Sequence, residues 1–70
     1  MISVGVRLMA IKNMGFIEMP GSIIAINETC KVTALEVISG DMFYTIKSAT
    51  GIITRLSESA IFEYFKIYNK

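Results

Sequence analysis

The sequence predicts one all-β domain, residues 1–70, with about five antiparallel strands and one short helical turn near the C-terminus. Its length of 70 residues leaves room for a single domain. Short runs rich in β-branched and aromatic residues alternate between apolar and polar positions, as half-buried strands do. Residues 43–57, FYTIKSATGIITRLS, have the pattern of a tight hairpin.

We expect this hairpin to close with a three-residue loop at 49–51, because Gly51 can take the left-handed conformation that completes a type I turn with a bulge. The resulting register gives one mostly apolar face, which consists of Tyr44, Ile46, Ile52 and Leu56. The opposite, mostly polar face consists of Thr45, Lys47, Ile53 and Arg55. A two-residue loop would face Tyr44 with Arg55 and mix charge into the core, so we prefer the first register.

Two strands are expected before the hairpin. Residues 4–12 alternate as a strand, but Met9 and Ile11 make its second face apolar too, so we expect another element or another chain to cover it. Residues 29–39, TCKVTALEVIS, form the longest strand. Its apolar positions shift phase along the run, which predicts a bulge or a strong bend near residues 34–35.

A long loop, residues 13–28, connects these two strands. Pro20 and Gly21 predict a turn near its centre, with glycine supplying the positive φ of a type II turn. Across this turn, residues 16–19 and 22–26 can pair as a small hairpin.

Two interpretations fit the C-terminal segment. In one, Ser57 caps a helix of about ten residues with acidic residues toward its start and lysines toward its end. In the other, residues 57–61 form one helical turn and residues 62–68 form a short strand. The aromatic content of the segment favours the second interpretation.

In the order of its elements the chain resembles an SH3-like barrel. Residues 13–28 then correspond to the long loop after the first strand, 48–51 to the distal turn, and 57–61 to the helical turn. The resemblance spans nearly the whole chain, and it implies that the strands curl into a small barrel.

The chain departs from the SH3 domains that bind proline-rich peptides, whose groove needs aromatic residues that include a tryptophan. This sequence has no tryptophan, and its helical turn begins with Ser57 and Glu58 where that family has a proline. We therefore do not expect polyproline binding. The segment YTIKSATGIITRLSES also resembles short barrel proteins encoded by phages and prophages of Gram-positive bacteria, which implies an accessory role.

Composition limits the location of the protein. The single Cys30 cannot form an intramolecular disulfide, so we expect a reducing cytoplasm rather than secretion. The longest apolar run is four residues, 23–26, which is too short to span a membrane. Net charge is +1 without charged runs, so the sequence shows no basic cluster typical of nucleic-acid binding.

Catalytic chemistry has little support in the sequence. There is no histidine, so the usual general base and a zinc site of the usual kind are missing. Cys30 falls in phase with Val32 in an expected strand, where a buried structural cysteine is the better interpretation. The glycines match no phosphate-binding or dinucleotide spacing. We expect no enzymatic activity, metal or cofactor.

Binding is the remaining class of function. The chain is 53% apolar, which exceeds the about 45–50% of an average domain, so some apolar side chains have no assured place in the core. We predict a non-enzymatic protein-binding module, in the style of a phage accessory protein that modulates or inhibits a host protein. Self-association into a homo-oligomer is part of this hypothesis. The predicted partner-binding residues are Phe16, Glu18, Met19, Phe43, Lys47, Ile53 and Arg55.

Two alternatives stay open. A nucleic-acid-binding barrel would need its cations on one surface together with Tyr44 or Phe43 as a stacking platform. The cations in question are Arg7, Lys31, Lys47 and Arg55. A small-molecule sponge would need a pocket at an oligomer interface.

Overall fold

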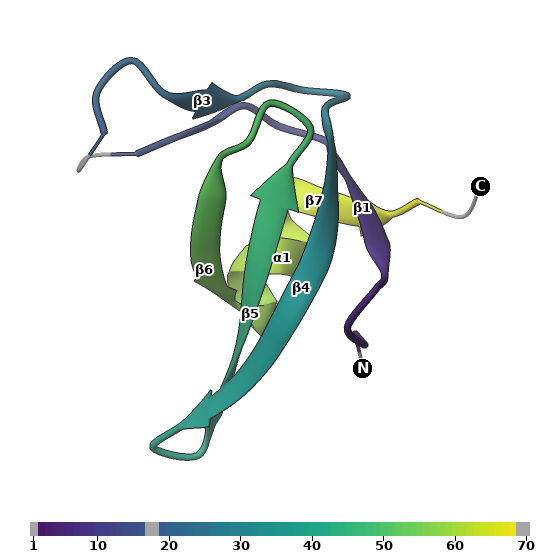
Figure 1. Ribbon diagram of the computed structural model, residues 1–70, viewed down its shortest axis with the longest axis vertical. Coiled ribbons are helices and arrows are strands. Elements are labelled where there is room, and N and C mark those ends of the chain that lie inside the picture. The colour runs from purple at the N-terminus through teal and green to yellow at the C-terminus, as the bar shows by residue number, and fades with distance from the viewer. Residues whose placement is uncertain (1, 17–18, 69–70) are drawn as a thin grey trace.

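The computed structural model describes residues 2–16 and 19–68 and is shown in Figure 1. In chain order the elements are β1 (Arg7–Ala10), β2 (Met14–Gly15), β3 (Ile23–Ile24), β4 (Thr29–Ile38), β5 (Asp41–Ser48), β6 (Ile53–Ser57), α1 (Glu58–Tyr64) and β7 (Phe65–Ile67). The prediction of an all-β domain with antiparallel strands and a helical segment near the C-terminus is confirmed.

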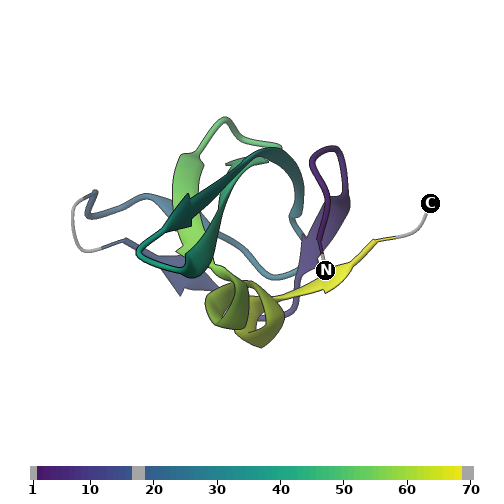
Figure 2. The same ribbon diagram turned by 90° about the horizontal axis from the view of Figure 1, so that it is seen from below.

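Five strands form one antiparallel sheet in the order β6-β5-β4-β1-β7, and β2 and β3 form a separate small sheet. The large sheet curls around the core, as the view from below shows in Figure 2. Among the described residues its two outer strands, β6 and β7, do not pair with each other. The expected barrel is therefore an open, curled sheet, with α1 packed on its inner side (Figure 1).

The predicted register of the β5–β6 hairpin is confirmed. Tyr44 lies opposite Leu56 and Ile46 opposite Thr54. The Gly51 N–H donates to the carbonyl oxygen of Ser48 at 3.0 Å, and Gly51 has a φ of +96°. This left-handed conformation carries no steric penalty in glycine, which explains why the turn closes at this residue.

The strand β4 contains the predicted irregularity, which lies between Val32 and Ala34 and so slightly earlier than expected. Beyond it, Leu35 and Val37 pair with β5 residues but are 41% and 62% exposed. Their exposure follows from the length of the two strands, because this end of the β4–β5 hairpin extends past the rest of the domain (Figure 1).

The segment after β6 combines features of both C-terminal interpretations. Ser57 is the N-cap of α1, and its Oγ accepts a hydrogen bond from the Ala60 N–H at 3.3 Å. The helix is longer than the single turn that we favoured, and the following strand is shorter, beginning at Phe65 rather than at residue 62. The helix extends through Tyr64, which packs partly against the core, and the Phe65 N–H closes the last turn by donating to the Ile61 carbonyl oxygen.

The first strand and the long loop also differ from expectation. Strand β1 begins at Arg7 instead of residue 4, because the Val6 N–H donates to the Ser3 carbonyl oxygen at 3.2 Å and turns the preceding chain. The loop folds on itself through Met14 opposite Ile24 and Gly15 opposite Ile23. The expected pairing of residues 16–19 with 22–26 includes residues 17 and 18, which lie outside the described residues. The turn at Pro20 and Gly21 is present, since the Ser22 N–H donates to Met19 at 3.0 Å.

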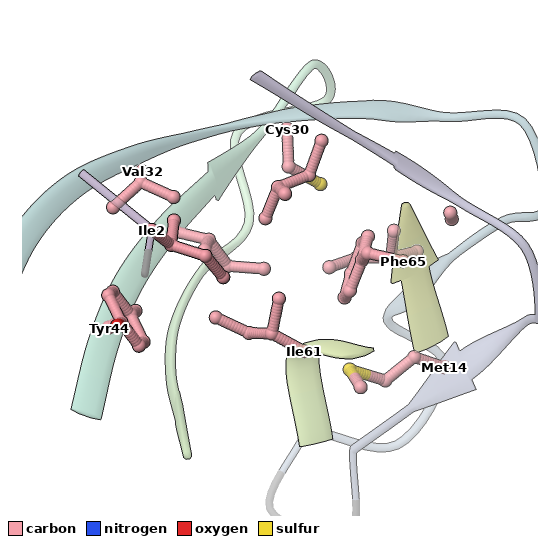
Figure 3. Packing of buried hydrophobic residues seen from close by; sticks show 11 residues of the cluster. Ile2, Met14, Cys30, Val32, Tyr44, Ile61 and Phe65 are labelled. Atoms are coloured by element: carbon pink, nitrogen blue, oxygen red, sulfur yellow. The ribbon is translucent and has the colours of Figure 1, made fainter. Parts of the chain in front are cut away.

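The core fills the concave side of the sheet and joins it to α1 and the long loop (Figure 3). Its buried hydrophobic residues are Ile2, Leu8, Ala10, Met14, Ile24, Cys30, Val32, Tyr44, Ile46, Ile61 and Phe65. Complete burial of a large apolar side chain contributes about 1.5–3 kcal/mol. The second apolar face expected of residues 4–12 is only partly covered, since Met9 in β1 is half-buried and Ile11, just after β1, is 41% exposed.

Glu28 connects the long loop to the β5–β6 turn through hydrogen bonds. Its carboxylate accepts hydrogen bonds from the Thr50 hydroxyl at 2.8 Å, the Thr50 N–H at 3.3 Å and the Ala25 N–H at 3.1 Å. Burial by itself would raise the pKa of Glu28, but the hydrogen bonds from Thr50, Ala25 and Ser48 outweigh it and lower the pKa below its usual value of 4.5.

We predict that Glu28→Gln lowers the free energy of unfolding at pH 7 by about 1 kcal/mol, because the charged acceptor of three hydrogen bonds is lost. A lowered pKa in the folded state stabilises the fold above the unfolded pKa, and this stabilisation disappears as pH falls through the folded value. The difference between wild type and variant should therefore shrink below about pH 4. Urea unfolding from pH 7 to pH 3 measures it.

Glu63→Gln is the matched control, because the ion pair of Glu63 with Lys12, at 3.8 Å, is exposed. Equal losses in both variants, or a Glu28→Gln loss that does not depend on pH, would contradict the role given to Glu28.

Candidate functional site

Three cations lie side by side on the outer face of the sheet, the face turned away from the core. Arg7 on β1 is opposite Lys31 on β4, and Lys31 is opposite Lys47 on β5. Residues directly opposite in antiparallel strands share a face, with Cβ atoms about 4.5–5.5 Å apart. All three side chains are exposed. We call Arg7, Lys31 and Lys47 the basic row.

The row has a residue of different chemistry at each end. Beyond Arg7 is the half-buried Tyr68, whose N–H donates to the Arg7 carbonyl oxygen at 2.9 Å. Beyond Lys47 is Ile53, which is 60% exposed. An aromatic residue and an aliphatic residue thus flank the cations on neighbouring strands.

A hollow of about 420 Å³ lies beside the basic row. It is lined by Arg7, Thr29, Cys30, Lys31, Thr33, Lys47, Ser48, Ala49 and Tyr68. None of these lining residues carries a carboxylate. The hollow therefore combines positive charge, hydroxyl groups and one aromatic ring, which are groups that bind anions.

The charges of the basic row are not neutralised by the rest of the described chain. The ion pairs among residues 2–16 and 19–68 join Lys12 to Glu63 and Arg55 to Glu36, and neither involves the row. Like charges directly opposite each other on neighbouring strands destabilise a sheet. Lys31 has such a neighbour on both sides, so the arrangement costs stability unless an anion occupies the face.

Arg55 and Phe43 share the outer face but form a separate group. Arg55 Nη1 donates to Glu36 Oε1 at 3.0 Å, and its guanidinium lies 5.9 Å from the centre of the Phe43 ring. Of the four cations that the nucleic-acid alternative requires, three are therefore together and free of ion pairs in the described structure, and Arg55 is compensated by Glu36.

Tyr44 cannot be the stacking platform that this alternative proposed, because its side chain is fully buried. Its hydroxyl lies 3.3 Å from Glu58 Oε2. Burial and the neighbouring Glu58 carboxylate raise the pKa of Tyr44. Phe43 is half-buried with Arg55 above its ring, so Tyr68, which the sequence analysis did not single out, is the better-placed aromatic residue.

The predicted partner-binding residues do not form one surface. Phe43, Lys47, Ile53 and Arg55 share the outer face of β5 and β6. Phe16 packs partly against the core, and Met19 is 42% exposed in the long loop. Glu18 lies outside the described residues.

Cys30 is buried, as the sequence predicted, and is 4% exposed. Burial and the negative charge of Glu28 raise the pKa of its thiol to about 11, so the thiol is protonated at neutral pH. Within the part of the chain that the structure describes, no cluster of histidine, cysteine or acidic residues is arranged to hold a metal ion.

Comparison of the chain with known protein families, with curated proteins and with solved structures found no match. Among the described residues, no helix has the length and apolar character that a membrane crossing requires.

We predict that Lys31→Thr raises the free energy of unfolding by about 0.5 kcal/mol, because it removes two like-charge contacts and places a β-branched residue in a strand. The gain should decrease at high salt, which screens the repulsion. Urea unfolding at low and high salt measures both effects.

Lys66→Thr provides the control, since Lys66 is also an exposed strand lysine but lies opposite Met9. If the two substitutions change stability equally at low salt, the basic row is not under electrostatic strain.

Proposed function

We propose that this protein is a non-enzymatic nucleic-acid-binding module that holds a phosphate backbone against the outer face of its sheet. The observation that carries the proposal is the basic row, whose three cations lie in register beside a hollow without a carboxylate in its lining. A phosphate backbone supplies the regularly spaced negative charges that such a row complements.

The length of the basic row limits the number of phosphates that it can contact, and so the affinity for nucleic acid. Neighbouring strands are about 4.8 Å apart, so the three cations span about 10 Å. At about 3.4 Å per stacked nucleotide, this distance corresponds to about three phosphates. Three phosphate contacts give weak binding on their own, so contacts with the bases have to contribute.

Single strands fit these requirements better than duplexes. Tyr68 and Ile53 flank the row at its two ends, where unpaired bases can stack or make apolar contacts. Stacking of a base on an aromatic ring contributes about 1–3 kcal/mol and does not depend on sequence. We therefore propose binding of single-stranded nucleic acid with little sequence preference.

Several expectations from the sequence belong to the same proposal. The order of strands, long loop, hairpin and helix supports an SH3-like domain with an open sheet, and an accessory role of the phage type is compatible with it. The free, buried Cys30 supports a reducing cytoplasm. The raised pKa of this thiol and the absence of histidine from the sequence support a protein without catalytic activity.

The test is fluorescence anisotropy with a labelled single-stranded oligonucleotide at rising salt. With three phosphates neutralised, log K should fall with log salt at a slope of about −2, which is a loss of about 20-fold from about 50 to about 200 mM. Lys47→Thr should weaken binding and make the slope shallower by about 0.7.

Lys12→Thr is the control, because Lys12 is paired with Glu63 and does not line the hollow. Binding that is insensitive to salt, or that both substitutions weaken equally, would rule out the basic row as the nucleic-acid-binding surface.

A second candidate function is binding of a protein, either a host protein or a second copy of the chain. The observation that favours it is the exposure of Ile53, 60%, beside Phe43 and Arg55 on the outer face of β5 and β6. Large apolar side chains grouped on a surface are typical of interaction sites.

Light scattering over a concentration series tests the self-association form of this candidate. We expect the mass of the wild type to increase with concentration and Ile53→Glu to remain a monomer. Val4→Glu is the control, because Val4 is similarly exposed, 57%, but lies outside β5 and β6. If the wild type stays monomeric at all concentrations, self-association is excluded.

A further inference from the structure

We infer that the hollow beside the basic row is a subsite for one nucleotide that carries a terminal phosphate monoester. This inference deepens the proposed function and rests on it, because the phosphorylated end of a single strand is the form of the ligand that we favour. The same chemistry is present in a free nucleoside monophosphate, and the experiment below separates the two sources.

The charge of the hollow fits a monoester better than a phosphodiester. A phosphodiester within a strand carries one negative charge, whereas a phosphate monoester carries about 1.5 to 2 at neutral pH. Arg7, Lys31 and Lys47 all line the same hollow, and no lining residue is acidic. A terminal dianion can pair with two neighbouring cations of the row at once, whereas an internal phosphodiester is matched by one.

The hydrogen-bond donors also fit a group with three terminal oxygens. The guanidinium of Arg7 can bind two phosphate oxygens at once, and the two lysines supply further charged donors. Thr29 lines the hollow from the outer face of β4, opposite Met9. Thr33 lies at the irregularity of β4, and its hydroxyl donates a long hydrogen bond of 3.4 Å to the Thr45 carbonyl oxygen.

The volume limits the ligand to about one nucleotide. The hollow measures about 420 Å³, which is near the lower end of the about 300–1,000 Å³ typical of small-ligand sites. Tyr68 forms part of the same lining, so a base can stack on its ring while the phosphate contacts the basic row. A longer strand has to leave the hollow after its first nucleotide.

The experiment compares three forms of one labelled oligonucleotide by anisotropy: with a 5′-phosphate, with a 3′-phosphate and with hydroxyl groups at both ends. We expect one phosphorylated form to bind at least about tenfold more tightly than the unphosphorylated form, because of the added charge-assisted hydrogen bonds. A nucleoside monophosphate should compete for this form, and the corresponding nucleoside should not.

Thr29→Val tests the assigned hollow, because it removes one hydroxyl and keeps the shape of the side chain. It should reduce the binding advantage that the terminal phosphate gives over the unphosphorylated strand. Thr54→Val makes the same chemical change on the inner face of β6, away from the hollow, and should leave the advantage intact.

Each result separates the inference from the proposed function. Equal binding of all three oligonucleotides overturns the inference and leaves the proposed function standing. Binding of the nucleoside monophosphate by calorimetry without binding of any oligonucleotide supports the subsite, assigns it to a free nucleotide and overturns the proposed function. Failure of every ligand to bind overturns both.

Discussion

The pairing register of β4 with its two neighbours, β1 and β5, places Lys31 between Arg7 and Lys47. This register is strongly enforced by the core. Cys30 and Val32, on either side of Lys31, are 4% and 0% exposed. Because side chains alternate between the two faces of a strand, a slip of one residue would bury Lys31 and expose both apolar neighbours. Burial on one face thus fixes the row of cations on the other.

The irregularity between Val32 and Ala34 divides the outer face into two regions. On one side lies the basic row, and on the other side Glu36 reaches Arg55 across the sheet. Without the extra residue in β4, Glu36 would stand on the opposite face of the strand. The bulge therefore gives Arg55 its partner, whereas the basic row has no carboxylate beside it in the hollow's lining. Cations that no partner neutralises are the ones available to an anionic ligand.

The sequence was sufficient for the features that depend on local chemistry. Gly51 predicted the turn and the register of the β5–β6 hairpin, and Ser57 predicted the start of α1. The shift in apolar phase predicted the irregularity in β4. These predictions succeeded because a left-handed glycine, a capping hydroxyl and a period of two are all properties of short segments.

The features that depend on distant pairing were not predictable in the same way. Arg7, Lys31 and Lys47 were candidate cations of one possible surface from the sequence, but only the pairing of β4 with β1 and β5 shows that they are neighbours. Tyr68 was missed because its position beside Arg7 depends on the pairing of β7 with β1. The length of α1 was underestimated because the strand preference of its aromatic residues is a weak signal, which the packing of Tyr64 against the core outweighs.

The central claim is that the outer face of β1, β4 and β5 is the binding surface, and a ¹H–¹⁵N NMR titration with a single-stranded oligonucleotide tests it most directly. The claim predicts that amide shifts change most at Arg7, Lys31, Lys47 and their neighbours on the outer face, and that the changes reverse when salt is added. Changes confined to the exposed end of the β4–β5 hairpin at Leu35 and Val37, with the basic row unaffected, would contradict it.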